Sequence, residues 1–60
     1  MPYISIKHAG ALTREQKKEI AKEVTETMQR VANKPASYTY ITFDEVAYED
    51  WAIGGKLLDE

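Results

Sequence analysis

One long helical pattern stands between two alternating segments, and this order leaves a chain of sixty residues few ways to fold. Residues 2–8 and 37–43 alternate between two faces and are rich in β-branched and aromatic side chains, which predicts a strand in each. Between them, Thr13 opens a helical pattern that runs to about Asn33. Because the connection is long and helical, we expect two parallel strands joined by a right-handed crossover.

The alternation assigns the side chains of each predicted strand to two faces. In the first strand these faces hold Ile4, Ile6 and His8 on one side and Tyr3, Ser5 and Lys7 on the other. In the second strand they hold Thr39, Ile41 and Phe43 on one side and Tyr38, Tyr40 and Thr42 on the other.

The predicted helix has a recognisable start, a buried stripe and a stop. Thr13 and Gln16 have the spacing of a capping box, in which each side chain bonds the other residue's backbone N–H. The apolar positions share one helical face and are Ile20, Ala21, Val24, Met28, Val31 and Ala32. Pro35 lacks a backbone donor and disfavours helical geometry before it, so we expect the helix to end near Asn33.

The last part of the chain is less regular, but Ile53-Gly54-Gly55 is typical of a turn or hairpin. We therefore predict one α/β (α+β) domain over residues 1–60. Its subunit has a short β-α-β unit with two parallel strands and one long helix, followed by a C-terminal hairpin. Two strands under one helix leave sheet edges and a whole sheet face uncovered, and such edges invite pairing with another chain.

The chain contains no cysteine and a single histidine. It therefore has no means of forming a disulfide framework, and we expect no metal site. A scaffold this small usually gains its remaining stability by oligomerisation. The residue content thus favours a subunit of an assembly.

Charge and hydropathy exclude several classes of function. The formal net charge is −2 and no basic block is present, so we expect no nucleic-acid partner. No apolar run approaches the roughly 20 residues that span a bilayer, so we expect no membrane partner. The start, MPYISIKHAG, lacks the pattern of a signal peptide, and the expected location is the cytoplasm.

Pro2 is the residue with the most distinctive chemistry. Removal of Met1 would leave Pro2 as a terminal secondary amine at the head of a strand. An ordinary α-amino group has a pKa of about 7.7–8.0, and burial lowers it further. A neutral amine near physiological pH can act as a general base next to a carbonyl.

Three segments of the chain resemble one known family. MPYISIK, TREQKKEIAKEVTETM and WAIGGK, in this order, are similar to the 4-oxalocrotonate tautomerase family of the tautomerase superfamily. The resemblance covers nearly the whole chain. It implies a homo-oligomer, usually a hexamer built as a trimer of dimers. It also implies an N-terminal proline that acts as general base in keto-enol proton transfer on a small 2-hydroxy-dienoate or enol-pyruvate-like substrate, without a cofactor.

The resemblance also implies roles for individual residues. Pro2 matches the catalytic base, and Trp51 matches an aromatic residue that walls the substrate pocket. The family's two substrate-binding arginines correspond to Leu12 and Tyr40, and neither can form a charge-assisted pair with a carboxylate. We expect these two to contact substrate without anchoring it. The Tyr40 phenol is either a packed strand aromatic with a solvated hydroxyl, which we favour, or a donor to an enolate oxygen.

The other polar residues are expected to have structural or solvent-exposed positions and no role in catalysis. His8 is expected to be packed polar surface, and the possible replacement cations are Lys7, Arg14, Lys34 and Lys56. The acidic pairs Asp44-Glu45 and Glu49-Asp50 are expected to follow the second strand as solvated loops.

Two alternatives to an active homo-oligomer stay open. Retention of Met1 would make the Pro2 nitrogen an amide, leaving a silent family member whose oligomeric scaffold is what matters. The missing arginines are also compatible with the proline-donating subunit of a heterohexamer.

Overall fold

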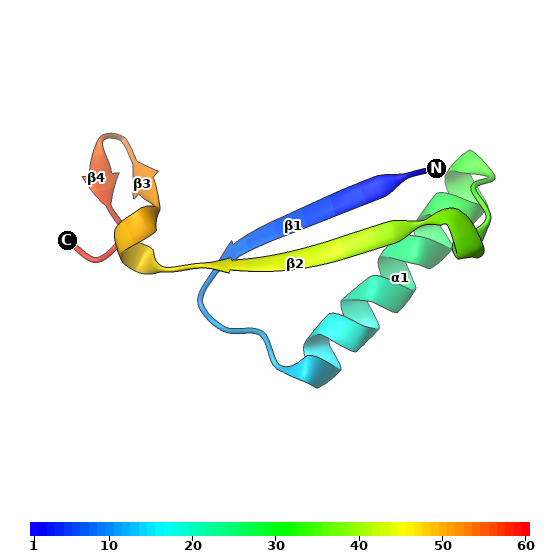
Figure 1. Ribbon diagram of the computed structural model, residues 1–60, viewed down its shortest axis with the longest axis horizontal. Coiled ribbons are helices and arrows are strands. Elements are labelled where there is room, and N and C mark those ends of the chain that lie inside the picture. The colour runs from blue at the N-terminus through cyan, green and yellow to red at the C-terminus, as the bar shows by residue number, and fades with distance from the viewer.

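The computed structural model describes residues 1–60, and its elements follow the predicted β-α-β order (Figure 1). The larger elements are β1 (Tyr3–Ala9), α1 (Arg14–Ala32) and β2 (Tyr40–Val46), and the hairpin consists of β3 (Ala52–Ile53) and β4 (Lys56–Leu57). Two short 3-10 turns lie at Ala36–Tyr38 and Tyr48–Asp50. β1 pairs with β2 in parallel and β3 pairs with β4 in antiparallel fashion, which confirms the predicted α/β (α+β) class.

The first strand lies one residue later than predicted, but the second strand was placed too early. Residues 37–43 were predicted as strand, whereas β2 begins at Tyr40. The preceding residues form a 3-10 turn, in which the Tyr38 N–H donates to the Pro35 carbonyl at 3.0 Å. The pair Asp44-Glu45 was expected after the strand and instead lies inside it. There Asp44 is opposite Lys7, so the strand can accommodate its charge.

The helix begins and ends as its sequence predicts. Gln16 N–H donates to Thr13 Oγ1 at 3.1 Å, and Thr13 N–H donates to Gln16 Oε1 at 2.9 Å, which completes the capping box. Asn33 ends the helix with φ 58° and ψ 33°, a left-handed conformation that asparagine tolerates better than most residues. Its N–H still donates to the Gln29 carbonyl at 3.1 Å.

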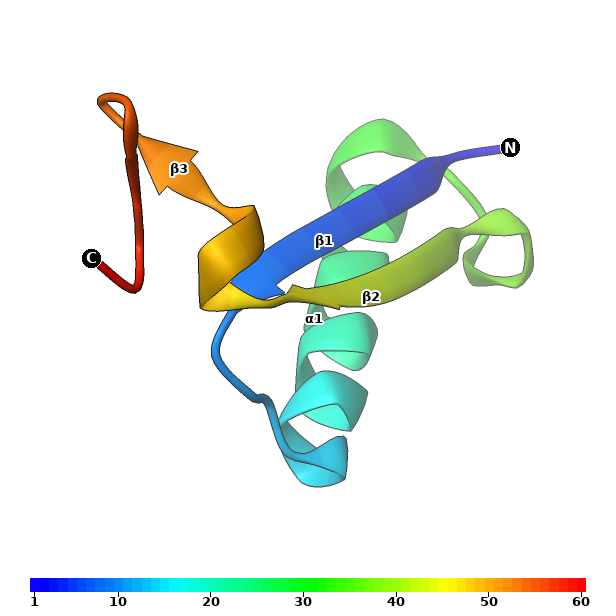
Figure 2. The same ribbon diagram turned by 60° about the vertical axis from the view of Figure 1, so that its left-hand side comes forward.

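α1 covers one face of the β1–β2 sheet and leaves the other face open (Figure 2). The half-buried side chains on the covered face include Ile4, Ile6, His8, Ile41 and Phe43, as the alternation predicts. From the helix, Ile20, Ala21, Val24 and Met28 are also half-buried. The predicted stripe is wrong at its end, where Val31 is 73% exposed and Ala32 is exposed too. Val31 lies on the same helical face as the half-buried residues. Its exposure therefore reflects the lack of a packing neighbour at the last turn of the helix.

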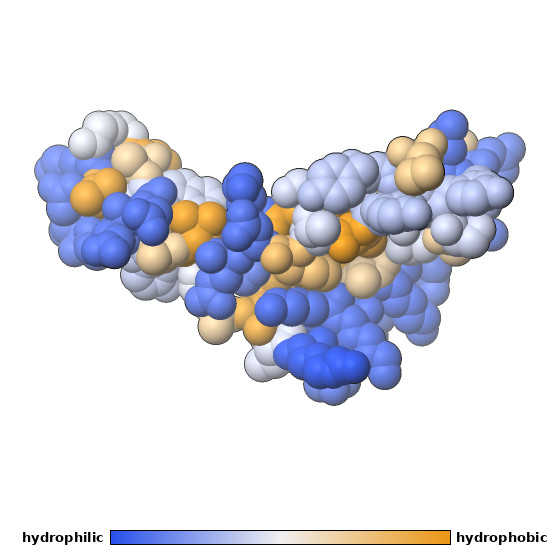
Figure 3. All heavy atoms as spheres, viewed as in Figure 1, coloured by the Kyte–Doolittle hydropathy of each residue, from blue (hydrophilic) through white to orange (hydrophobic).

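No residue of the isolated protomer is buried. Its radius of gyration is 14.3 Å, whereas a compact chain of this length has a value of about 10 Å. Its accessible surface is 4839 Å², against about 4,000 Å² for an ordinary folded monomer of this mass. Hydrophobic side chains remain visible along the middle of the molecule and on the hairpin (Figure 3). The apolar faces of α1 and the sheet therefore meet in the single protomer without forming a fully buried core.

The C-terminal hairpin lies at the end of the sheet opposite the N-terminus (Figure 1). Gly54 and Gly55 have φ values of 60° and 85°, the two positive angles that a two-residue type I′ turn requires. The Leu58 N–H donates to the Trp51 carbonyl at 2.9 Å and closes the base of the hairpin. α1 is the longest helix, and neither it nor the shorter helical turns have the apolar length of a membrane span.

Candidate active site

Pro2 lies immediately before β1 and is half-buried. Its carbonyl accepts a hydrogen bond of 2.9 Å from the Tyr40 N–H, which fixes the first residues of the chain against the start of β2. Met1 precedes it and is 85% exposed, with nothing of the fold built around it. Removal of Met1 would therefore expose the Pro2 amine without disturbing the sheet.

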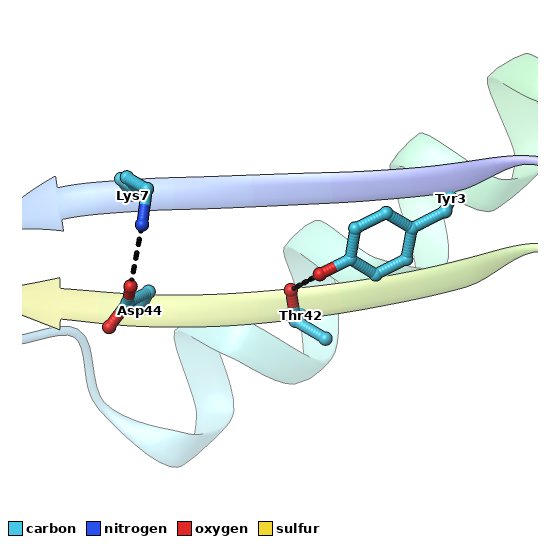
Figure 4. Close-up of polar contacts among 4 residues, drawn as sticks. All are labelled: Tyr3, Lys7, Thr42 and Asp44. Atoms are coloured by element: carbon cyan, nitrogen blue, oxygen red, sulfur yellow. Dashed lines mark hydrogen bonds and ion pairs between the residues drawn. The ribbon is translucent and has the colours of Figure 1, made fainter.

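Tyr40 shares this end of the sheet with Pro2. It is opposite Tyr3 in the strand register and is 54% exposed. The Tyr3 hydroxyl lies 2.7 Å from Thr42 Oγ1, so Tyr3 leans along the open sheet face toward β2 (Figure 4). The two strands thus present phenol groups at the proline end of the sheet, and neither strand contains an arginine.

Trp51 and Leu12 lie at the opposite end of the sheet. Leu12 follows the carboxyl end of β1, and Trp51 follows β2 after a short 3-10 turn. The seven residues of β1 rise about 3.3 Å each, so about 20 Å separates Pro2 from this end. The structure therefore brings Pro2 and Tyr40 together and separates both from Leu12 and Trp51 within one protomer.

Trp51 lines an open cavity of 360 Å³ whose other lining residues are Lys7, Val46, Asp50 and Ala52. Lys7 is the only basic side chain that lines a cavity together with Trp51. The other candidate cations lie elsewhere: Arg14 opens α1, Lys34 follows it, and Lys56 is in β4. Sequence reasoning treated Lys7 as one candidate among four, and the structure distinguishes it from the rest.

Lys7 is held on the open sheet face by a cross-strand ion pair (Figure 4). Its Nζ donates to Asp44 Oδ2 at 2.8 Å, and the two side chains are 63% and 55% exposed. The hydrogen bond and the charge of Asp44 raise the pKa of Lys7 above its ordinary 10.5. The same contact with Lys7 lowers the pKa of Asp44 below its ordinary 3.8. The pair was missed at the sequence level because Asp44 was expected beyond the strand.

His8 faces the helix and has a structural contact of its own. Its Nδ1 lies 2.7 Å from the Gly10 carbonyl, and since a carbonyl only accepts, Nδ1 is the donor. Its Nε2 is buried in the protomer and has no hydrogen-bond partner there. The ring therefore braces the turn after β1, in agreement with the expected packing role.

Comparison with known proteins adds a family to this geometry. A family profile described as "Tautomerase enzyme" matches residues 2–60, so the match begins at Pro2 itself. A Bacillus cereus protein named "Probable tautomerase" is 32% identical over 60 residues, and the match covers 100% of this chain and 98% of that protein.

Solved structures share the fold as well as the sequence. DmpI from Helicobacter pylori is 31% identical with a TM-score of 0.89, over 97% of this chain and 91% of that one. A 4-oxalocrotonate tautomerase isozyme from Methylibium petroleiphilum is 28% identical with a TM-score of 0.86, over 97% of this chain and 94% of that one.

Proposed function

The chain belongs to the tautomerase family, and from this premise we propose that it is an isomerase with Pro2 as its general base. The substrate would be a small 2-hydroxy-dienoate or an enol-pyruvate-like acid. The observation that carries the proposal is the position of Pro2, which is the first residue of the family match and the head of β1.

The basicity of Pro2 depends on removal of Met1. The freed nitrogen is a secondary amine, and burial of such a group disfavours its charged form and lowers its pKa toward neutrality. Pro2 is already half-buried in the protomer, and a neighbouring chain would shield it further. A neutral amine at the working pH is the state that a general base needs.

The proposed reaction is a proton transfer with no net change in composition. The Pro2 nitrogen removes the proton of the substrate's enol hydroxyl, and the resulting ammonium returns a proton to a carbon of the double-bond system. The oxygen becomes a ketone and the amine is regenerated. The reaction needs no cofactor.

A complete site requires a second protomer. Lys7 at the near wall of the Trp51 cavity is five strand residues from Pro2, about 16 Å at 3.3 Å per residue, so a single protomer does not supply both Pro2 and the cavity to one small molecule. Large apolar side chains exposed in the protomer offer surface for assembly; they include Val31, Ile53, Leu57 and Leu58. We propose a homo-oligomer, and the family resemblance makes a hexamer its expected form.

The uncharged residues Leu12 and Tyr40 narrow the substrate class. A dicarboxylate would lack the two bidentate anchors that arginine supplies, so we expect monocarboxylates to react better. The Tyr40 phenol remains a candidate hydrogen-bond donor to the developing enolate oxygen.

Ketonisation of 2-hydroxymuconate and of enol phenylpyruvate tests this proposal, with the protein freed of Met1 and its Pro2→Ala variant compared side by side. We expect kcat/KM to fall by about 10²- to 10⁴-fold in the variant, the usual contribution of a general base. Equal rates for the two proteins would remove Pro2 from the mechanism.

A second candidate function is that of a catalytically silent scaffold, and the uncharged Leu12 and Tyr40 favour it. The intact mass of protein isolated from cells discriminates between the two. A mass that includes Met1 supports the scaffold, because the Pro2 nitrogen is then an amide.

The chain could also donate the proline in a heterohexamer, a role favoured by the same two positions. Co-purification with a second chain that carries arginines would support this assembly. A stable, active oligomer of this chain alone would contradict it.

A further inference from the structure

We propose that Lys7 binds the substrate's carboxylate in the Trp51 cavity, where Asp44 holds the Lys7 ammonium across the strands and competes with the substrate for it. The inference rests on the proposed function, because it assumes that the substrate is an enol acid. It assigns to one residue of this chain the anchoring role that Leu12 and Tyr40 have no charge to perform.

The geometry of Lys7 leaves hydrogen-bonding capacity unused. An ammonium has three N–H donors, and only the one to Asp44 Oδ2, at 2.8 Å, is engaged. In the single protomer the side chain is 63% exposed on the open face of the sheet, so that no other residue of the same chain covers the remaining donors. Asp44 fixes the position of the charge across the strand and keeps its pKa high, so Lys7 remains protonated throughout the neutral range.

The cavity suits the two halves of a small enol acid. Its volume of 360 Å³ is within the range of about 300–1,000 Å³ typical of small-molecule sites. Trp51, Val46 and Ala52 provide apolar wall for the carbon skeleton, and Lys7 provides the only positive charge. Trp51 is thus both the predicted pocket wall and the neighbour of the cation.

Two carboxylates near Lys7 compete with an incoming anion for the ammonium, and this competition separates a binding role from a purely structural one. Asp44 shares the ammonium with any incoming anion, and Asp50 lines the same cavity. Removal of Asp44 should therefore favour anion binding, whereas removal of Lys7 should weaken it. If the pair only stabilised the sheet, both substitutions would break the same contact and act in the same direction.

Trp51 provides a direct readout, since it is the only tryptophan of the chain. Its fluorescence is followed during titration with phenylacetate and with the neutral phenylacetamide. Four proteins are compared: the wild-type oligomer and the Lys7→Gln, Lys7→Arg and Asp44→Asn variants. Gel filtration confirms that each variant keeps its assembly. Because phenylacetate binding requires no turnover, this measurement is separate from the Pro2→Ala test of the proposed function.

For phenylacetate, we expect Lys7→Gln to raise the Kd about tenfold, the loss expected for one charge-assisted hydrogen bond. Lys7→Arg should restore most of the affinity, and Asp44→Asn should lower the Kd. Phenylacetamide should bind all four proteins equally. An unchanged Kd in Lys7→Gln, or a rise in both Lys7→Gln and Asp44→Asn, would overturn the assignment. A phenylacetamide Kd that moves in parallel with that of phenylacetate would overturn it too.

Discussion

The proposed chemistry depends on one nitrogen atom, and its state is set by a neighbouring residue. With Met1 attached, the Pro2 nitrogen is an amide and has no basicity. Without Met1, it is an amine held at the start of β1 by the hydrogen bond between the Pro2 carbonyl and Tyr40. The fold therefore fixes the position of the proposed base, and removal of Met1 would activate it.

The proposed role of Trp51 as an aromatic pocket wall can be tested by changing only the size of its side chain. In Trp51→Phe an aromatic wall remains beside Lys7 in the cavity, whereas in Trp51→Ala the wall is lost. We expect kcat/KM for enol phenylpyruvate to stay within a few-fold in the first variant and to fall about tenfold or more in the second. Steady-state kinetics on oligomers matched by gel filtration check this, and an equal loss in both variants would point to the indole N–H instead.

Single residues also show how far sequence reasoning reaches. Thr13 and Gln16 were predicted to cap the helix, and their bonds of 3.1 and 2.9 Å confirm it, because capping depends only on local spacing. The contact of Lys7 with Asp44 was missed, because it joins residues 37 positions apart and depends on the register of two strands. Contacts between residues that are distant in the sequence cannot be predicted from local sequence patterns.

At the scale of elements, α1 and the sheet stabilise each other through half-buried side chains alone. Ile20, Val24 and Met28 face the sheet, and none of them is fully buried in the protomer. The boundaries of α1 follow from its caps, whereas β2 was displaced in the prediction by three residues. Tyr38 and Thr39 favour strands and lead directly into Tyr40, so composition alone did not separate the end of the 3-10 turn at Ala36–Tyr38 from the start of β2.

Val24→Asp tests the assignment of the helix face. It places an unpaired carboxylate against the sheet, and we expect the free energy of unfolding to fall by about 3 kcal/mol or more. Gln29→Asp introduces the same side chain at an exposed position of α1 and should change stability little. Thermal denaturation and gel filtration measure both variants. If Val24→Asp behaves like Gln29→Asp, the assigned face is wrong.

At the scale of the whole molecule, the single protomer encloses no interior of its own. It has no buried residue, exposes Val31 at 73% and Ile53 at 72%, and spans 42 Å along its longest axis. Small size and uncovered sheet edges already predicted association from the sequence. The sequence did not reveal that Pro2 and Trp51 lie at opposite ends of one protomer, since this follows from the parallel pairing of β1 and β2 and from the hairpin's place beyond them.

The most direct test of a site shared between protomers is complementation between two variants that are each impaired at a different residue. Pro2→Ala and Trp51→Ala are co-expressed, the mixed oligomers are isolated free of Met1, and the rate of ketonisation of enol phenylpyruvate is measured. In random hybrids, about a quarter of the sites pair an intact Pro2 with an intact Trp51 from another chain, so we predict recovery of about a quarter of the wild-type rate. A mixture no more active than the sum of its two components would contradict the shared site and place the reaction within one protomer.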